Sequence, residues 1–205
     1  MDSSDGKFII VGGGGFGREV ASWVRLSNVM GFLDDGLAEI PRPYPPLLGK
    51  VDQAPQWRGK ASFLLAIGDP RGRQSVAQRL QQMQVEITTF IHRSAHVVET
   101  ASLAPGCLIG PFANVSAGAK LGRSVIINAY SGAGHDAEVG EFVTMSAHVD
   151  VCGYVKLGAG VFLGSHASVL PKVTVGAGAR IGAGAMVARN VPQDVTVYGP
   201  LAKKL

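Results

Sequence analysis

The sequence carries little charge: only 17% of its 205 residues are charged, whereas 46% are hydrophobic and 28 residues are glycine. A disordered low-complexity chain is also rich in glycine, but it does not hold so many hydrophobic residues. The composition therefore excludes such a chain and indicates a regular backbone with many tight corners. The length allows one domain or two small ones, and either can bury a core.

Long apolar runs and clustered charges are also missing. No stretch approaches the roughly 20 apolar residues that a membrane span needs, and the acidic start MDSSDGKF predicts no signal peptide. We therefore expect a cytoplasmic protein. The net charge of +4 comes from scattered basic residues. This pattern suits an anionic small molecule such as a nucleotide and gives poor support for nucleic-acid binding.

Cysteine is scarce. The two cysteines, Cys107 and Cys152, stand in apolar or Gly-rich surroundings and lack the spacing of a metal site. We expect both to be reduced and structural.

Residues 91–192 repeat with a period of six. They form 17 consecutive hexads in which the first residue is Ile, Val, Leu or Met in all but one, the exception being Ala133. The fifth residue is always Ala, Val, Ser or Cys. This register predicts a parallel β-helix, in which short strands and tight corners form the three faces of a prism with 18 residues per coil. The first residue of each hexad then points into the core.

Glycine is frequent at the second position of the hexads. Because Gly and Asn tolerate the positive φ that tight corners often need, we expect the second position to adopt that conformation. The repeat alone leaves the hand of the coil open, so a β-solenoid of another hand is the alternative.

The first ninety residues alternate between strand and helix patterns. The predicted strands lie in 7–12, 29–35, 62–68 and 87–92, and the predicted helices span 18–27 and 73–83. This alternation indicates a small parallel α/β domain over residues 1–88, ahead of a β-helix domain over residues 89–205.

A Gly-rich turn follows the first predicted strand. The spacing Gly12-x-Gly14-x-x-Gly17 matches the dinucleotide fingerprint, in which glycines let the backbone approach a phosphate at a helix N-terminus. Asp34 lies about 20 residues downstream, where a carboxylate can accept ribose hydroxyls. Since the domain is half the usual size, the pattern favours a mononucleotide or nucleotide-sugar over NAD. A ligand-free turn is the alternative, with Asp34 and Asp35 as turn formers.

Histidine provides the candidate for catalysis. His135 precedes Asp136 in AGHDAE, the one hexad with a small first residue, and a carboxylate that orients an imidazole is typical of a general base. The alternative is an exposed corner histidine. His148 and His166 are one coil apart and should stack on one corner. They lack further ligands of suitable type, so we expect no metal.

The chain resembles the bacterial nucleotide-sugar acetyltransferases of the sialic-acid O-acetyltransferase-like family, which includes N-acetyltransferases of amino-sugar nucleotides. The segments that carry the resemblance are VGGGGFG, GFLDD, AIGDPRGR, FIHRSA, INAYSGAGHDAEVGEF and IGAGAMV. The resemblance implies a Rossmann-like domain before a left-handed β-helix, acetyl-CoA as co-substrate, and homotrimers with active sites at subunit interfaces. In such trimers His135 faces a neighbour's coil.

The resemblance also implies roles for individual residues. His135 is the general base, and Asp136 raises its basicity. The nucleotide-sugar contacts are Gly14, Gly15, Phe16, Asp34, Asp35 and Gly68, and the acetyl-CoA contacts are Thr144, Ser165 and Ala183. Two residues depart from the family pattern, because Phe16 and Thr144 stand where relatives often carry histidine.

Together these patterns predict direct transfer of an acetyl group from acetyl-CoA to the amine of a nucleotide-linked sugar, without a covalent enzyme intermediate. One alternative is O-acetylation of sialic acid or a related sugar by the same base. The other is a binding or scaffold protein that has kept the coil without the chemistry.

Overall fold

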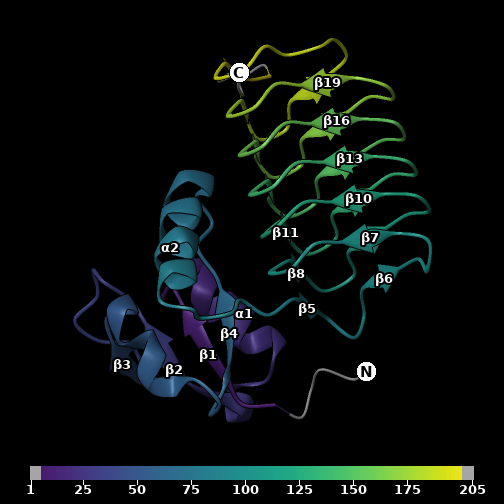
Figure 1. The fold of residues 1–205 in the computed structure, drawn as a ribbon. Coiled ribbons are helices and arrows are strands. Elements are labelled where there is room, and N and C mark those ends of the chain that lie inside the picture. The colour runs from purple at the N-terminus through teal and green to yellow at the C-terminus, as the bar shows by residue number, and fades with distance from the viewer. Residues whose placement is uncertain (1–5, 200–205) are drawn as a thin grey trace, which may run out of the picture.

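A computed structural model describes residues 6–199. In it, a small α/β region lies beside the N-terminal end of a long coil of short strands (Figure 1). The last coils extend beyond the α/β region. The molecule is therefore asymmetric, with a compact region attached to one end of a solenoid.

Four parallel strands form the sheet of the α/β region, in the order β3-β2-β1-β4. Their bounds are β1 (Phe8–Val11), β2 (Val29–Leu33), β3 (Leu47–Gly49) and β4 (Ser62–Leu65). The prediction of a parallel α/β fold is confirmed. Strand β3 was not predicted, because its three residues directly follow a Pro-rich loop and show no alternation.

Two α-helices and two 3₁₀ turns connect these strands: α1 (Gly15–Trp23), η1 (Leu26–Asn28), η2 (Val51–Trp57) and α2 (Pro70–Gln82). The prediction of a helix over 18–27 was wrong at both ends. Helix α1 begins directly at the Gly-rich turn, and it ends before Arg25, whose φ of 63° lies outside the helical region. Helix α2 begins at Pro70 and is capped by Asp69, whose carboxylate accepts from the Gly72 N–H at 2.9 Å.

The coil is a left-handed parallel β-helix with three faces. We call them the first, second and third face. The first face contains β5 (Phe90–Ile91), β8 (Leu108–Ile109), β11 (Ile126–Ile127), β14 (Thr144–Met145), β17 (Phe162–Leu163), β20 (Arg180–Ile181) and β22 (Thr196–Val197). The second contains β6 (His96–Val97), β9 (Asn114–Val115), β12 (Gly132–Ala133), β15 (Asp150–Val151), β18 (Ser168–Val169) and β21 (Met186–Val187). The third contains β7 (Ser102–Leu103), β10 (Lys120–Leu121), β13 (Glu138–Val139), β16 (Lys156–Leu157) and β19 (Thr174–Val175).

The predicted register of 18 residues holds in every pair within the coil up to β20. Ile126 pairs with Thr144, for example, and Ala133 pairs with Val151. From the second coil onward the first residues of the hexads, such as Val115, Ile127 and Val151, are buried in one continuous apolar core. The prediction that the first and fifth positions fill the core is confirmed there.

The prediction about the glycines of the second position was wrong. The positive φ falls on the fourth position instead, where Tyr130, Asp136 and His148 have values between 56° and 60°. The second-position glycines are needed for a different reason, because the next coil passes close to their α-carbons. A Cβ atom on Gly140 would lie 2.7 Å from the backbone nitrogen of Ala159.

The fourth-position residues between the first and second faces stack into an exposed ladder. The rings of His148 and His166 are parallel with centroids 4.6 Å apart, as their one-coil spacing predicted. Tyr130 stacks on His148 at 5.0 Å, and Phe112 stacks on Tyr130 at 5.0 Å. The register of the coil thus dictates which distant residues meet.

The α/β region packs against the outer side of the first face. Leu108 and Ile126, which point outward from β8 and β11, share an apolar cluster with Val20 and Trp23 of α1. Phe142, at the corner between the third and first faces, joins a second cluster with residues around α2. The helices of the α/β region therefore contact both corners that border the first face.

Candidate active site

His135 and Asp136 occupy the corner between the second and third faces, in the turn between β12 and β13. The Nδ1 atom of His135 lies 3.0 Å from the Oδ2 atom of Asp136. The sequence left open whether the two side chains meet, and the structure shows that they do. Because a carboxylate only accepts, it holds the imidazole proton on Nδ1 and leaves the Nε2 lone pair free to take a proton.

The space around Nε2 depends on Gly153, which stands one coil further along the same corner. A Cβ atom on Gly153 would collide with the His135 ring, and its nearest contact would be Nε2. The ring of Tyr154 meets the imidazole edge to face, with centroids 5.0 Å apart. The His135 side chain remains 58% exposed, so the imidazole is open to a second molecule.

The glycines of the Gly-rich turn have different tasks. Gly12 has a φ of 104°, and a Cβ atom on Gly17 would collide with the Gly12 carbonyl, so these two glycines pack helix α1 against strand β1. Gly14 and Gly15 have no atom within 4 Å of where a Cβ would stand. Open space thus lies above the N-terminus of α1, where backbone N–H groups favour an anion.

The two carboxylates after β2 are bound within the protein. Asp34 accepts from the Gly13 N–H at 2.8 Å and from the N–H groups of Gly36 and Leu37. Asp35 accepts from the Val51 N–H at 3.0 Å and pairs with Arg79, whose hydrogen bond lowers the pKa of the Asp35 carboxyl. These contacts support the turn-forming interpretation. Asp34 nevertheless lies directly beside the Gly-rich turn.

Phe16 packs edge-on against Trp23 with ring centroids 5.7 Å apart. Its side chain is partly buried in the apolar cluster between α1 and the first face. An imidazole at this position would offer a polar group to a ligand beside the glycines. The phenyl ring offers only an apolar surface.

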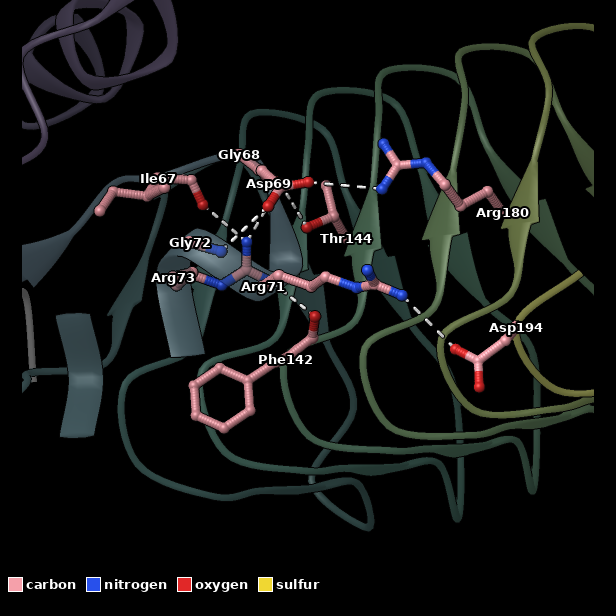
Figure 2. A network of polar contacts seen from close by, with 10 residues as sticks. All are labelled: Ile67, Gly68, Asp69, Arg71, Gly72, Arg73, Phe142, Thr144, Arg180 and Asp194. Atoms are coloured by element: carbon pink, nitrogen blue, oxygen red, sulfur yellow. Dashed lines mark hydrogen bonds and ion pairs between the residues drawn. The ribbon is translucent and has the colours of Figure 1, made fainter. Parts of the chain in front are cut away.

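The loop after β4, residues 67–69, is bound tightly to the coil. The Gly68 carbonyl accepts from the Thr144 hydroxyl at 2.8 Å and from Arg73 Nη1 at 3.2 Å (Figure 2). Arg73 Nη1 also donates to the Ile67 carbonyl at 2.6 Å. The same guanidinium donates to Ser124 and Phe142 on two successive coils. One side chain therefore connects the loop to the corner between the third and first faces.

Arg73 is fully buried, and its hydrogen bonds all go to carbonyl groups. Burial lowers the pKa of the guanidinium to about 10, so the group stays protonated at neutral pH. The negative charge of Asp69 opposes this lowering, and its carboxylate lies 3.3 Å from Arg180 Nη1. Figure 2 shows this pair. The Gly72 N–H and, more weakly, Arg180 lower the pKa of Asp69.

The three predicted acetyl-CoA contacts fall in two places. Ser165 and Ala183 lie on adjacent coils of the corner between the first and second faces, and the Ser165 carbonyl accepts from the Gly184 N–H at 2.9 Å. Thr144 lies on the first face, is nearly buried, and donates its hydroxyl to Gly68. The structure thus brings Ser165 and Ala183 together and places Thr144 at the interface with the α/β region.

Metal binding and membrane insertion are the two other properties to consider. Within residues 6–199, no cluster of three or more His, Cys, Asp or Glu side chains has the arrangement of a metal site. No helix in that part of the chain is both long and apolar enough to cross a bilayer.

Comparison with known proteins identifies both parts of the chain. The model of the PglD N-terminal domain matches residues 7–80, and the model of the bacterial transferase hexapeptide, in six repeats, matches residues 154–189. A variant of perosamine N-acetyltransferase from Caulobacter crescentus, solved with CoA and GDP-perosamine, is 29% identical with a TM-score of 0.88. The match covers 95% of this chain and 94% of that one. The chain is an acetyltransferase with a hexapeptide-repeat coil.

Two other solved proteins are similar to this acetyltransferase over nearly its whole length. The acetyltransferase domain of PglB from Neisseria gonorrhoeae, solved with acetyl coenzyme A, is 27% identical with a TM-score of 0.87, over 97% of this chain and 98% of that one. WeeI from Acinetobacter baumannii is 25% identical with a TM-score of 0.86, over 94% and 96%. No curated protein sequence matches the chain.

Three residues that lie beside the predicted site residues were not predicted from the sequence. These are Arg73, Arg180 and Gly153. Arg73 stands in a helix that reads as amphipathic, and nothing local indicates that it reaches carbonyls on two coils. Gly153 does carry a signal, because the 18-residue register places it next to His135.

Proposed function

We propose that this acetyltransferase transfers the acetyl group of acetyl-CoA to the amine of a nucleotide-linked amino-sugar, with His135 as the general base. The observation that supports this most is the His135–Asp136 hydrogen bond with a free, accessible Nε2. Since similar proteins were solved with CoA and GDP-perosamine, or with acetyl coenzyme A, the same substrate classes are proposed here.

In this mechanism the amine nitrogen attacks the thioester carbonyl. Nε2 of His135 takes one proton from the amine as the C–N bond forms. The C–S bond then breaks, and the leaving thiolate takes that proton from the imidazolium and departs as the thiol of CoA. Asp136 stabilises the imidazolium that results. Direct transfer needs no covalent intermediate, and the buried Cys107, whose pKa burial raises to about 11, is unsuited as a nucleophile.

We propose that the nucleotide-sugar lies over the Gly-rich turn, with Gly14, Gly15, Phe16, Asp34, Asp35 and Gly68 around it. Ser165 and Ala183 border the acetyl-CoA site in this proposal, and Thr144 is the third predicted contact. The open space at Gly14, Gly15 and Gly68 supports the first assignment. The hydroxyl of Thr144 already has a partner, which makes that residue the weakest member of the cofactor set.

The position of His135 favours a site shared between subunits. The α/β region contacts the two corners that border the first face, at Ser124 and Phe142 on one side and at Gly110 on the other. His135 lies on the third corner, away from this region. A nucleotide-sugar held by one chain is therefore proposed to meet His135 of another chain in a homotrimer.

Thiol release from acetyl-CoA over a panel of UDP-, GDP- and dTDP-linked amino-sugars tests the proposed reaction. We expect release with at least one member and a product in which the nitrogen is acetylated, as mass spectrometry with fragmentation would show. The matched control is the same sugar with a hydroxyl in place of the amine. Faster release with that control, or with free sialic acid, would contradict N-acetylation and favour O-acetylation.

A further inference from the structure

Gly68 is held by side chains that the proposed chemistry does not use. Its carbonyl oxygen accepts from the Thr144 hydroxyl at 2.8 Å and from Arg73 Nη1 at 3.2 Å, and the preceding Ile67 carbonyl accepts from the same nitrogen at 2.6 Å. Two consecutive carbonyls of this loop therefore point toward one buried guanidinium (Figure 2).

The orientation of these carbonyls sets the direction of two N–H groups. In a trans peptide unit the N–H points opposite to the carbonyl, so the N–H groups of Gly68 and Asp69 point away from Arg73. Within residues 6–199 neither of them donates a hydrogen bond. The space where a Cβ of Gly68 would stand is open to beyond 4 Å. The Gly68 and Asp69 N–H groups thus have no partner within the described residues, and they stand beside the open space at Gly68.

Most of the groups that fix the Gly68 loop and Arg73 belong to the coil. Thr144 belongs to β14, and the guanidinium of Arg73 is itself fixed by the carbonyls of Ser124 at 3.1 Å and Phe142 at 2.7 Å. Thr144, Ser124 and Phe142 are buried, whereas Ile67 and Gly68 are partly exposed. The bonds from Arg73 to the coil are therefore shielded from water, and the bond from Thr144 to Gly68 is partly shielded.

We infer that Arg73 and Thr144 are positioning residues of the nucleotide-sugar site: they fix the Gly68 loop on the coil so that the Gly68 and Asp69 N–H groups face oxygen atoms of the bound nucleotide-sugar. This inference rests on the proposed function. It assigns Thr144 to the sugar side of the reaction and makes its contribution to acetyl-CoA binding secondary.

Thr144→Val and Thr144→Ser test the inference. Valine keeps the shape of threonine but cannot donate to the Gly68 carbonyl, whereas serine keeps the hydroxyl. We expect Thr144→Val to raise the KM for the nucleotide-amino-sugar roughly 5- to 10-fold, the equivalent of one hydrogen bond, with the KM for acetyl-CoA unchanged. Thr144→Ser should recover most of this loss. Substitution of Arg73 is less informative, because the loss of a fully buried arginine affects folding as well as the site.

Arg123→Gln is the matched control. Arg123 also joins the coil to α2, through Gln81 at 3.4 Å, but it does not touch the Gly68 loop. The control should leave both KM values within about twofold, because exposed contacts of this kind contribute little. Melting temperatures of all variants distinguish repositioning from unfolding.

Three results would overturn the inference. Equal behaviour of Thr144→Val and Thr144→Ser would remove the role of the hydroxyl, and so would an unchanged nucleotide-sugar KM in Thr144→Val. A rise confined to the KM for acetyl-CoA would return Thr144 to the cofactor site. In each case a wild-type enzyme that acetylates its nucleotide-sugar leaves the proposed function intact. A wild type that neither binds nor acetylates any nucleotide-sugar would contradict both.

Discussion

The space beside the Nε2 atom of His135 exists because residue 153 has no side chain. The 18-residue register sets Gly153 next to the imidazole, and a Cβ atom there would collide with the ring. Among residues 6–199, the ring is otherwise held by its bond to Asp136 and its contact with Tyr154. Both contacts lie at the protein surface. The position of the imidazole therefore also depends on the small gap at residue 153, which one methyl group would fill.

Gly153→Ala should therefore displace the imidazole while leaving the coil folded. We expect kcat to fall about 10- to 100-fold, since misplacement of a catalytic group by about 1 Å costs on this order. Steady-state kinetics with acetyl-CoA and the best nucleotide-sugar measure the effect. Gly132→Ala is the control, because its Cβ would meet its nearest neighbour, Asn114, at an ordinary 3.7 Å. A Gly153→Ala enzyme as active as the control would contradict this role of the gap.

The pair of His135 and Asp136 could be predicted at the residue level, because the two are adjacent in sequence and stand in the one irregular hexad. That they form a hydrogen bond could not, since a turn can point neighbouring side chains apart. The contacts of Asp34 and Asp35 were also beyond sequence reasoning. They depend on Gly13, Val51 and Arg79, which tertiary folding brings to the end of β2.

Within each hexad the second and fourth positions meet different physical demands. The fourth position adopts positive φ, which Phe, Tyr, His, Asp and Lys all adopt here as well as glycine. The second position meets the backbone of the following coil, where several glycines leave no room for a side chain. The steric demand is therefore stricter than the conformational one.

Asparagine substitutions at two neighbouring corners test this difference. Gly160→Asn should change the free energy of unfolding by less than about 1 kcal/mol, because the site is open and asparagine tolerates positive φ. Gly140→Asn should destabilise the coil by about 2 kcal/mol, because its Cβ would overlap the backbone at Ala159. Urea denaturation followed by circular dichroism measures both. Equal losses would contradict the steric account.

The sequence predicted the coil better than it predicted the α/β region. A period of six over a hundred residues repeats one local geometry, so each hexad supports the assignment of the next. Helix α1 and strand β3 had no such support. The boundary of α1 depends on the backbone of Arg25, and β3 is a strand only because it pairs with β2.

At the scale of the whole molecule, the α/β region and His135 lie on different sides of the coil. The 1–88 and 89–205 division remains a prediction. The contacts of Arg73 and Thr144 nevertheless show that residues before and after this boundary build one interface. The contacts across this interface could not be predicted from sequence, because the residues that meet are 51 to 76 positions apart and follow no repeat.

A subunit-mixing measurement tests the central claim most directly. His135→Ala removes the proposed base, and Gly15→Leu places a side chain in the open space over the Gly-rich turn. Each variant alone should lose nearly all thiol release from acetyl-CoA with the nucleotide-amino-sugar, by at least about 100-fold for the base. Both should keep the wild-type melting temperature.

Co-expressed in equal amounts, the two inactive chains should form mixed trimers with about a quarter of the wild-type activity, because one chain supplies His135 and its neighbour supplies the intact turn. Near-full kcat in His135→Ala alone would contradict the assignment of the base. Mixed trimers as inactive as the parent variants would contradict a site shared between subunits.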